Sequence, residues 1–560
     1  MKTLHIQSRK IYRLYFQVMM ILFLSATCGA VDAQSPAPLR KTEDALPGKV
    51  RIKVKPAFAA RLSQVRMKTA RIGKDPVLLS GIQALDNVHK TYKVHNFQRV
   101  FRPAGIYESR HRKYGLDRWY EIDMDTTASL QQAIAAFGNI EDIEKVEPVY
   151  RKTINGSAKR DFGPVRVNPL AGPIAGAGPD DPMFPQQWHY NNTGQSGGTP
   201  GADIDLLKAW KLETGKSHVV VAVMDGGVQT DHEDLAANMW VNAGEVAGNN
   251  IDDDNNGFID DIHGYGFGDN TGAIAPDDHG THVGGTVAAV TNNGIGVSGV
   301  AGGSGSGDGI RLMSCAVFGA TAQDNFPESY VYAADMGAVI SQNSWGYYYG
   351  YEQVVLDAID YFIAEAGKDA NGNQVGPLNG GVVIFSSGND NYEFDAYPGA
   401  YEPVIAVAAT THNDVRSYYS TFGWWVDISA PGGETDVDER QGILSTLSAN
   451  QYGFFQGTSM ACPHVSGVAA LLVSKYGGPG YSPAALRQQL LAGTEDINAL
   501  QHPSVVKKIG KGRLNAANTL YTPDAVAPEA IHDLTITDIT HTSLTISWTS
   551  PSDPGDYPAL

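Results

Sequence analysis

Between residues 180 and 522, short apolar runs alternate with segments that have the spacing of helices. The helical segments include Tyr351–Ala366 and Met460–Lys475. Runs that are apolar at nearly every position are typical of strands buried on both faces, as in parallel sheets covered by helices. The pattern therefore predicts an α/β domain built on a parallel sheet. Its predicted strands include Val219–Met224, Val339–Ser341, Val382–Phe385 and Val404–Ala408.

Residues 34–150 predict a separate, small α/β unit. Trp119–Met124 and Ile143–Tyr150 have the pattern of strands. Ser129–Phe137 has helical spacing between them, and its first residue fits a capping box with Gln132. Residues 151–179 are rich in Gly, Pro and small side chains and have no periodicity. Such a stretch is typical of a linker, where proteases cut.

The first 33 residues have the features of a secretory signal peptide. A basic start, Lys2–Arg13, precedes an apolar run over residues 14–26, and Val31-Asp32-Ala33 fits a small-x-small cleavage site. The run is shorter than the roughly 20 residues that a membrane-spanning helix needs. An uncleaved signal anchor is the alternative. Cleavage would leave two cysteines, Cys315 and Cys462, which is too few for a disulfide framework.

Residues 527–560 predict the beginning of a β module. Leu544, Ile546 and Trp548 alternate with polar residues and share one face of a strand. The segment resembles the start of a fibronectin type III domain, a β-sandwich of roughly 100 residues. We therefore expect the module to be truncated at Leu560 relative to the natural gene product, because two strands alone are marginally stable.

The charge of the chain excludes one class of function. Among 560 residues there are 42 Lys and Arg and 60 Asp and Glu, a net charge of −18. A nucleic-acid binder needs a basic face, so this balance argues against nucleic acid as a partner. The charge is unevenly divided, because residues 1–160 hold 28 basic and 14 acidic side chains, and residues 161–560 hold 14 and 46. The two parts are expected to attract each other, and salt should weaken that attraction.

Three segments of the α/β region carry side chains suited to catalysis. Asp225 ends an apolar run, His279 begins the segment His-Gly-Thr-His, and Ser459 lies in Gly-Thr-Ser before an apolar helix. Singly, they have ordinary explanations as a turn-forming Asp, a metal-binding His and a helix cap. Together they supply an acid, a base and a nucleophile, in the order Asp, His, Ser. Open α/β sheets place active sites beyond the carboxyl ends of their strands, where Asp225 is expected.

On these three motifs, residues 180–522 resemble a subtilisin-like serine protease. The resemblance implies that His279 takes the proton of Ser459 and passes it to the leaving amine, while Asp225 orients and stabilises the imidazolium. It also implies that Asn389, which follows the apolar strand over residues 382–386, donates to the oxyanion beside the Ser459 N–H. The implied reaction is hydrolysis of peptide bonds through an acyl-enzyme.

The same resemblance assigns two segments to substrate binding. Ser344-Trp345-Gly346 matches the edge along which an extended peptide pairs as a strand. Ser386-Ser387-Gly388 would line the other side of the pocket for the residue before the scissile bond. For Trp345, ordinary packing in the core is the alternative.

One position departs from the family pattern. Thr or Ser usually follows the catalytic Asp, whereas this chain has Gly226. A hydroxyl there helps to hold the carboxylate, so its absence leaves room for a second interpretation. In that interpretation the chain is a catalytically weak or inactive protein of the subtilase fold that serves binding or adhesion. An esterase acting through the same three residues is a third.

An acidic loop predicts a structural calcium ion. Its oxygen-bearing residues match positions 1, 3, 5, 7 and 9 of a calcium-binding loop, with Gly257 at the turn. His263 occupies position 12, where a complete EF-hand has Glu. A solvated acidic loop without a cation is the alternative. The candidate ligands are Asp252, Asp254, Asn256, the Phe258 carbonyl and Asp260.

More weakly, residues 50–150 resemble the prosegment of secreted subtilases, which templates folding and inhibits the enzyme until it is cleaved off. The resemblance implies a secreted zymogen that acts on proteins or peptides and is inhibited by its own prosegment. Attachment to the cell surface stays open, and no membrane span is expected after signal removal. Cleavage within residues 151–180 would leave a mature enzyme that begins near Asp180. An independent binding domain is the alternative.

Overall fold

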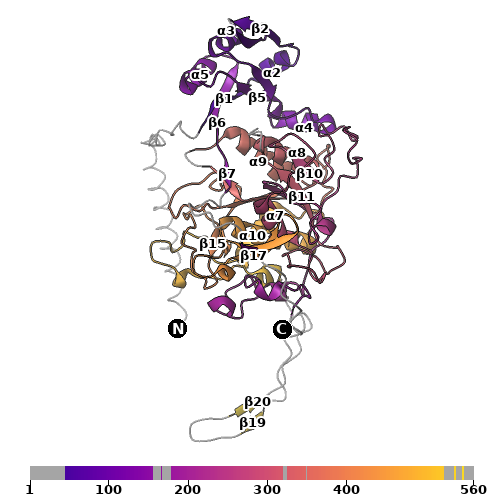
Figure 1. Cartoon of the computed structure of the whole chain (residues 1–560), viewed down its shortest axis with the longest axis vertical. Helices are drawn as coiled ribbons and strands as arrows, with labels where there is room; N and C mark the ends of the chain where they lie inside the picture. Colours follow the sequence, from indigo (N-terminus) through magenta and orange to yellow (C-terminus); the bar gives the residue numbers. More distant parts are fainter. Residues whose placement is uncertain are drawn as a thin grey trace, which may run out of the picture. The chain divides into compact units, whose positions relative to one another are not determined.

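A seven-stranded parallel sheet lies at the centre of residues 180–521 in the computed structural model (Figure 1). The strand order is β10-β11-β9-β12-β14-β15-β16, and every neighbouring pair is parallel. The predicted α/β class is confirmed. The strands are β9 (Val220–Asp225), β10 (Gly264–Gly266), β11 (Arg311–Ala316), β12 (Ile340–Asn343), β14 (Val382–Ser386), β15 (Ile405–Thr410) and β16 (Ile428–Pro431).

The structure describes residues 45–72, 74–154, 178–319, 325–347 and 350–521, together with three short strands outside these ranges. One of these is β8 (Val165–Arg166), and the others are β19 (Thr535–Thr537) and β20 (Thr545–Ser547), which pair antiparallel. The signal peptide predicted at residues 1–33 and most of the module predicted at 527–560 lie outside the described residues. Within the described parts of the chain, no helix combines the length and apolar character that crossing a membrane requires.

Helices cover both faces of the sheet and enclose two cores (Figure 1). Val221 and Val223 of β9 belong to one core, and Ala222 and Met224 belong to the other. Successive residues of a strand point to opposite faces, so a strand covered on both sides is apolar at every position. The first core also contains residues of α7 (Asp278–Ala288) and α10 (Thr458–Tyr476), and the second contains residues of α8 (Phe326–Asp335) and α9 (Gln353–Glu365).

The remaining elements of this region lie at its periphery. β17 (Ile443–Leu447) and β18 (Gln451–Phe455) form an antiparallel hairpin before α10. The further helices are α6 (Leu206–Ala209), α11 (Pro483–Ala492) and α12 (Ala516–Leu520).

Residues 45–150 form a four-stranded antiparallel sheet in the order β4-β5-β1-β6, with helices packed against it (Figure 1). The two predicted strands and the predicted helix of this unit are present, and the Ser129 side chain accepts from the N–H of Gln132 at the helix start. The elements are β1 (Ala45–Val54), α2 (Pro56–Leu62), β2 (Lys68–Ile72), β3 (Asp75–Leu79), α3 (Gln83–Tyr92), β4 (Asn96–Arg99), α4 (Glu108–Lys113), β5 (Trp119–Asp123), α5 (Leu130–Gly138) and β6 (Ile143–Tyr150).

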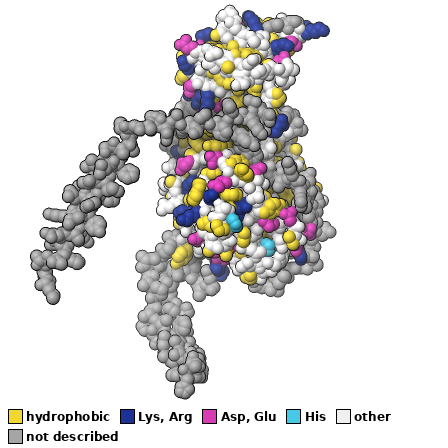
Figure 2. Space-filling view, turned by 90° about the vertical axis from the view of Figure 1, so that its left-hand side faces the viewer, with side chains coloured by type: hydrophobic (Ala, Val, Ile, Leu, Met, Phe, Trp, Pro, Cys, Tyr) yellow, Lys and Arg dark blue, Asp and Glu magenta, His cyan; other side chains and the backbone are white. Residues whose placement is uncertain are grey.

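Basic side chains of this N-terminal unit contact acidic side chains on α8 and α9. The fully buried Arg51 binds Glu352, just before α9, at 2.9 Å, and Lys152 reaches the same carboxylate at 2.6 Å. Among the described residues, the bases of the ion pairs named here come from the N-terminal unit or, for Lys152, from the chain that directly follows it. Figure 2 shows acidic and basic side chains interspersed on one face of the molecule. The other interface pairs are Lys53–Asp357, Arg102–Glu328, Arg110–Asp335, His111–Asp335 and Lys113–Glu365.

Two stretches of the predicted linker pair as strands with the sheet region. β7 (Thr153–Ile154) pairs antiparallel with β13 (Trp345–Gly346), and β8 pairs antiparallel with β18. The sequences of these two-residue strands show no alternation of apolar and polar positions. They are strands because their backbones form hydrogen bonds with the edge of another strand. Sequence periodicity therefore did not reveal them.

Gly467, in the middle of α10, provides a test of the packing between this helix and the loop at Val300. An added Cβ at Gly467 would lie 2.5 Å from the Val300 Cβ. Ala in a helix interior normally stabilises by about 0.5–1 kcal/mol relative to Gly, but overpacking a core costs about 1–3 kcal/mol. We expect Gly467→Ala to lower the melting temperature by a few degrees in scanning calorimetry. Gly138→Ala in α5, where an added Cβ meets nothing within 4 Å, is the control and should leave stability unchanged or slightly higher.

Candidate active site

Asp225 is the last residue of β9 and lies at the carboxyl edge of the parallel sheet. Its side chain is 1% exposed. Oδ1 accepts from the backbone N–H of Gly226 and from Nδ1 of His279, both at 2.7 Å. Oδ2 has no hydrogen-bond partner among the described residues. A rigid buried strand therefore holds one oxygen of the acid against the imidazole.

His279 lies in the first turn of α7, and the side chain of Asp277 caps this helix. Oδ1 of Asp277 accepts from the backbone N–H groups of His279 at 2.9 Å and Gly280 at 3.1 Å. Burial lowers the pKa of His279, but the carboxylates of Asp225 and Asp277 outweigh it, so the pKa lies above its usual value. Nε2 has no hydrogen-bond partner in the described parts of the chain, which leaves this nitrogen able to receive a proton.

Ser459 is held by a reciprocal contact with Ser344. Pro463 has no N–H, so the Ser459 carbonyl four residues earlier lacks the partner that a helix normally supplies. The Ser344 hydroxyl donates to that carbonyl at 2.9 Å, and the Ser459 hydroxyl donates to the Ser344 carbonyl at 3.3 Å. The serine hydroxyl thus points at Ser344 rather than at Nε2 of His279, whereas the contact between Asp225 and His279 is already formed.

Asn389 lies beside the turn that carries Ser459. It follows β14, and its Oδ1 accepts from both the N–H and the hydroxyl of Thr458 at 2.9 Å. The N–H of Gly388 also donates to the Thr458 hydroxyl, at 3.2 Å. These contacts join the end of β14 to the start of α10. The structure thus pairs Asp225 with His279 and Asn389 with the residue before Ser459, and it packs the helix of His279 against the helix of Ser459.

The two segments predicted to bind substrate also reach this edge of the sheet. The Trp345 side chain is fully buried and packs edge-to-face against Phe385, so it contributes to the core as the alternative interpretation held. Its backbone belongs to β13, which pairs with Ile154 of β7. Ser387 donates through its hydroxyl to the Thr421 carbonyl, and Gly388 has a φ of +104°, which favours glycine. Ser344 and Ser386, at the ends of β12 and β14, border these positions.

In the acidic loop, two of the predicted ligands, Asp252 and Asp254, lie close to each other and to a third carboxylate. Carboxylate oxygens of Asp252, Asp254 and Glu245 all lie within 4.8 Å of one another. Asp260 instead accepts from the N–H groups of Asn249 and Asn250, and Asn256 binds Asp254 and the N–H of Phe258. Sequence reasoning missed Glu245, because it precedes the loop at no regular spacing. Three neighbouring carboxylates match the hard oxygen donors that Ca²⁺ prefers.

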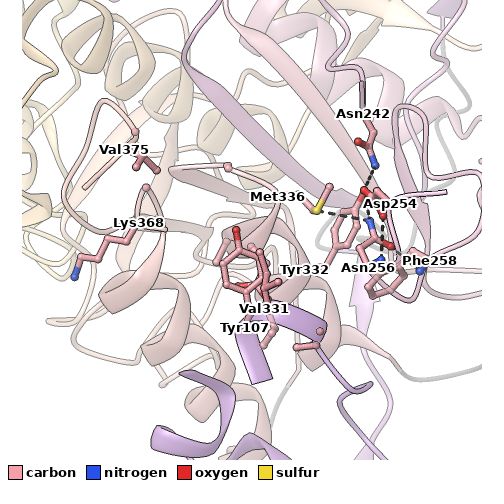
Figure 3. Close-up of a pocket in the computed structure, with 18 of the residues that line it drawn as sticks. Tyr107, Asn242, Asp254, Asn256, Phe258, Val331, Tyr332, Met336, Lys368 and Val375 are labelled. Atoms are coloured by element: carbon pink, nitrogen blue, oxygen red, sulfur yellow. Dashed lines mark hydrogen bonds between the residues drawn. The ribbon is translucent and has the colours of Figure 1, made fainter. Parts of the chain in front are cut away.

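A cavity of about 1180 Å³ adjoins this loop (Figure 3). Its lining includes Phe101–Tyr107 of the N-terminal unit and Val331 and Tyr332 of α8. Figure 3 shows Asn242, Asp254 and Asn256 joined by hydrogen bonds on one side of it. None of its lining residues is Asp225, His279, Asn389 or Ser459. The cavity is therefore separate from the candidate active site.

Residues 216–512 match the model of the subtilase family, peptidase S8. This segment makes up more than half of the chain and contains Asp225, His279, Asn389 and Ser459. The chain belongs to the subtilase family. The subtilase match therefore agrees with the resemblance inferred from the three motifs.

Individual relatives support the same assignment. Thermitase from Thermoactinomyces vulgaris is 34% identical over 49% of this chain and 80% of its own length. The extracellular basic protease of Dichelobacter nodosus is 31% identical over 68% of this chain and 61% of its own length. The chain spans about three fifths of the length of several curated relatives that it matches. The crystal structure of fervidolysin from Fervidobacterium pennivorans, 20% identical, has the same fold, with a TM-score of 0.54 over 91% of this chain and 69% of that one.

Proposed function

We propose that this subtilase is a secreted serine endopeptidase that hydrolyses peptide bonds in proteins through Asp225, His279 and Ser459. The observation that carries the proposal is the 2.7 Å contact between Asp225 Oδ1 and His279 Nδ1, on the helix α7 that packs against α10, whose second residue is Ser459. Secretion is supported by the predicted signal peptide and by relatives named extracellular proteases. A catalytically weak binding or adhesion protein is the alternative, with Gly226 as its only support.

The geometry suits the acyl-enzyme reaction. With Nδ1 bound to Asp225, Nε2 of His279 accepts the Ser459 proton while Oγ forms a bond to the substrate carbonyl carbon. His279 then gives that proton to the leaving amine as the C–N bond breaks. Water attacks the resulting ester with His279 again as the base, which restores Ser459. The oxyanion would be stabilised by the amide of Asn389 and the N–H of Ser459 at the helix start.

Two substitutions test this assignment directly. Ser459→Ala removes the nucleophile and should abolish cleavage of casein and labelling by a fluorophosphonate. Asn389→Ala should lower kcat by about 10²–10³-fold, the loss known for the corresponding donor in subtilisin. Unchanged casein cleavage by Ser459→Ala would refute the proposal. Hydrolysis of esters without hydrolysis of peptides would instead favour an esterase.

We also infer that residues 34–150 are an inhibitory prosegment. β7 occupies the edge of β13, where an incoming peptide would pair. The basic surface of the unit meets the acids of α8 and α9, in keeping with the opposite charges of the two parts of the chain. Glu147 of β6 accepts from the first N–H groups of α9, at Gln353 and Val354, and burial together with Glu352 raises its pKa to about 7.

The pairing of β7 predicts where the chain cuts itself. Thr153 lies opposite Gly346 and Ile154 lies opposite Trp345. A substrate chain that continued this register by one residue would reach Ser344, whose carbonyl accepts from Ser459. We therefore expect the first cleavage at the bond between residues 155 and 156. Mass spectrometry of secreted protein should find this fragment end, before any trimming toward Asp180. The Ser459→Ala chain should stay intact, and a first cut beyond residue 165 would contradict the register.

We propose that Glu245, Asp252 and Asp254 hold a structural Ca²⁺. Their mutual repulsion needs a cation, and relatives from Trichormus variabilis and Nostoc, 29% identical, are named calcium-dependent proteases. Removing Ca²⁺ with a chelator should lower the melting temperature by several degrees. Glu245→Gln should remove most of that difference, whereas Glu439→Gln, at an exposed site, should retain it. A melting temperature that chelation does not change would count against the site.

A further inference from the structure

Gly226, the position that departs from the family pattern, lies against the carboxylate of Asp277. Its φ is outside the left-handed region that favours glycine, unlike that of its neighbour Gly227 at +123°. An added Cβ at Gly226 would lie 2.5 Å from Oδ1, 2.6 Å from Cγ and 2.9 Å from Cβ of Asp277. Space, rather than backbone conformation, therefore excludes a side chain at Gly226, and Asp277 fills that space.

Asp277 is fixed in this place by its own contacts. The two N–H groups of α7 bind its Oδ1, and its backbone N–H donates to the Gly227 carbonyl at 3.0 Å. A carboxylate oxygen of Asp225, a carboxylate oxygen of Asp277 and a ring nitrogen of His279 all lie within 4.8 Å of one another. The imidazole therefore has two carboxylates beside it, of which only Asp225 makes a hydrogen bond to the ring.

We propose that Asp277 is a positioning residue of the catalytic triad, a second carboxylate that stabilises the imidazolium of His279 in the space left by the missing side chain at position 226. The inference deepens the proposed function and rests on it. It also explains why Gly226 is compatible with activity. The hydroxyl that would lie beside Asp225 is missing, but the carboxylate of Asp277 lies beside His279 instead.

The electrostatics of the pocket agree with this role. Burial and the neighbouring Asp225 raise the pKa of Asp277, and the negative charge of Asp277 in turn raises the pKa of His279. Burial lowers the pKa of His282 to about 3 and that of His464 to about 4, so both are neutral near pH 7. Asp278, on the same helix, accepts from the N–H and hydroxyl of Ser448 instead. Among the described residues, Asp225 of β9 and Asp277 act on His279 directly, and His282 of α7 interacts with both His279 and His464 of α10.

The Asp277→Asn variant tests the charge of Asp277 separately from its role as the cap of α7. Asn caps helices as well as Asp does, so the variant keeps an acceptor for the N–H groups of His279 and Gly280 and loses only the charge. A protonated His279 is inactive as a base, and removing a nearby negative charge lowers its pKa. We therefore expect the acidic limb of the pH profile of kcat/KM, measured on the matured enzyme, to shift to lower pH by about one unit. The melting temperature should be nearly unchanged.

Asp278→Asn is the matched control, because it removes a neighbouring charge that is directed at Ser448. Its acidic limb should coincide with that of the unsubstituted enzyme. An unmoved limb in Asp277→Asn, or equal shifts in both variants, would overturn the inference while leaving the proposed function intact. Failure of the unsubstituted chain to cleave casein would instead overturn the proposed function itself.

A second comparison tests the steric coupling. Gly226→Ala should lower kcat/KM at least tenfold in the presence of Asp277, because the added Cβ displaces the carboxylate. Gly is tolerated at a helix N-cap nearly as well as Asp. In an Asp277→Gly background, the same substitution should therefore have little further effect. Equal losses in both backgrounds would show that the two positions act independently, and would contradict the inference.

Discussion

The parallel register of the central sheet is the constraint on which the site depends. Because all seven strands run the same way, their carboxyl ends meet at one edge, and the polar residues that end them converge there. Asp225 lies opposite Ala316 of β11, and Met224 lies opposite Asn343 of β12. Asn389 follows β14 at the same edge. Residues separated by more than 160 positions thus become neighbours without any local sequence signal that links them.

Ser459, the proposed nucleophile, is held in place because its helix lacks one backbone hydrogen bond. Pro463 withholds the hydrogen bond that would satisfy the Ser459 carbonyl, and Ser344 supplies it from the end of β12. Gly457, with a φ of +149°, forms the turn that leads into the helix. The hydrogen bond from Ser344 therefore joins the helix to the sheet at Ser459.

The N-terminal unit and the subtilase domain are joined by complementary charges. The bases of one face the acids of the other, and the fully buried Arg51 binds Glu121 and Glu352 at once. The chain that follows this unit forms β7, which pairs with β13 next to Ser344. An interface made of buried, paired charges is specific, because loss of one partner leaves the other desolvated and unpaired.

The sequence alone predicted the parallel α/β domain and the small unit before it, and it marked Asp225, His279, Asn389 and Ser459 as candidates for catalysis. It could do so because strands buried on both faces require unbroken apolar runs, and because the three motifs are local. Only the tertiary structure decided which distant groups join them: β7 against β13, Glu245 beside Asp252, and Asp277 in the space at Gly226. These contacts depend on the spatial distance between segments that lie far apart in the chain. The hydrophobic periodicity of a segment predicts only the secondary structure and the buried face of that segment.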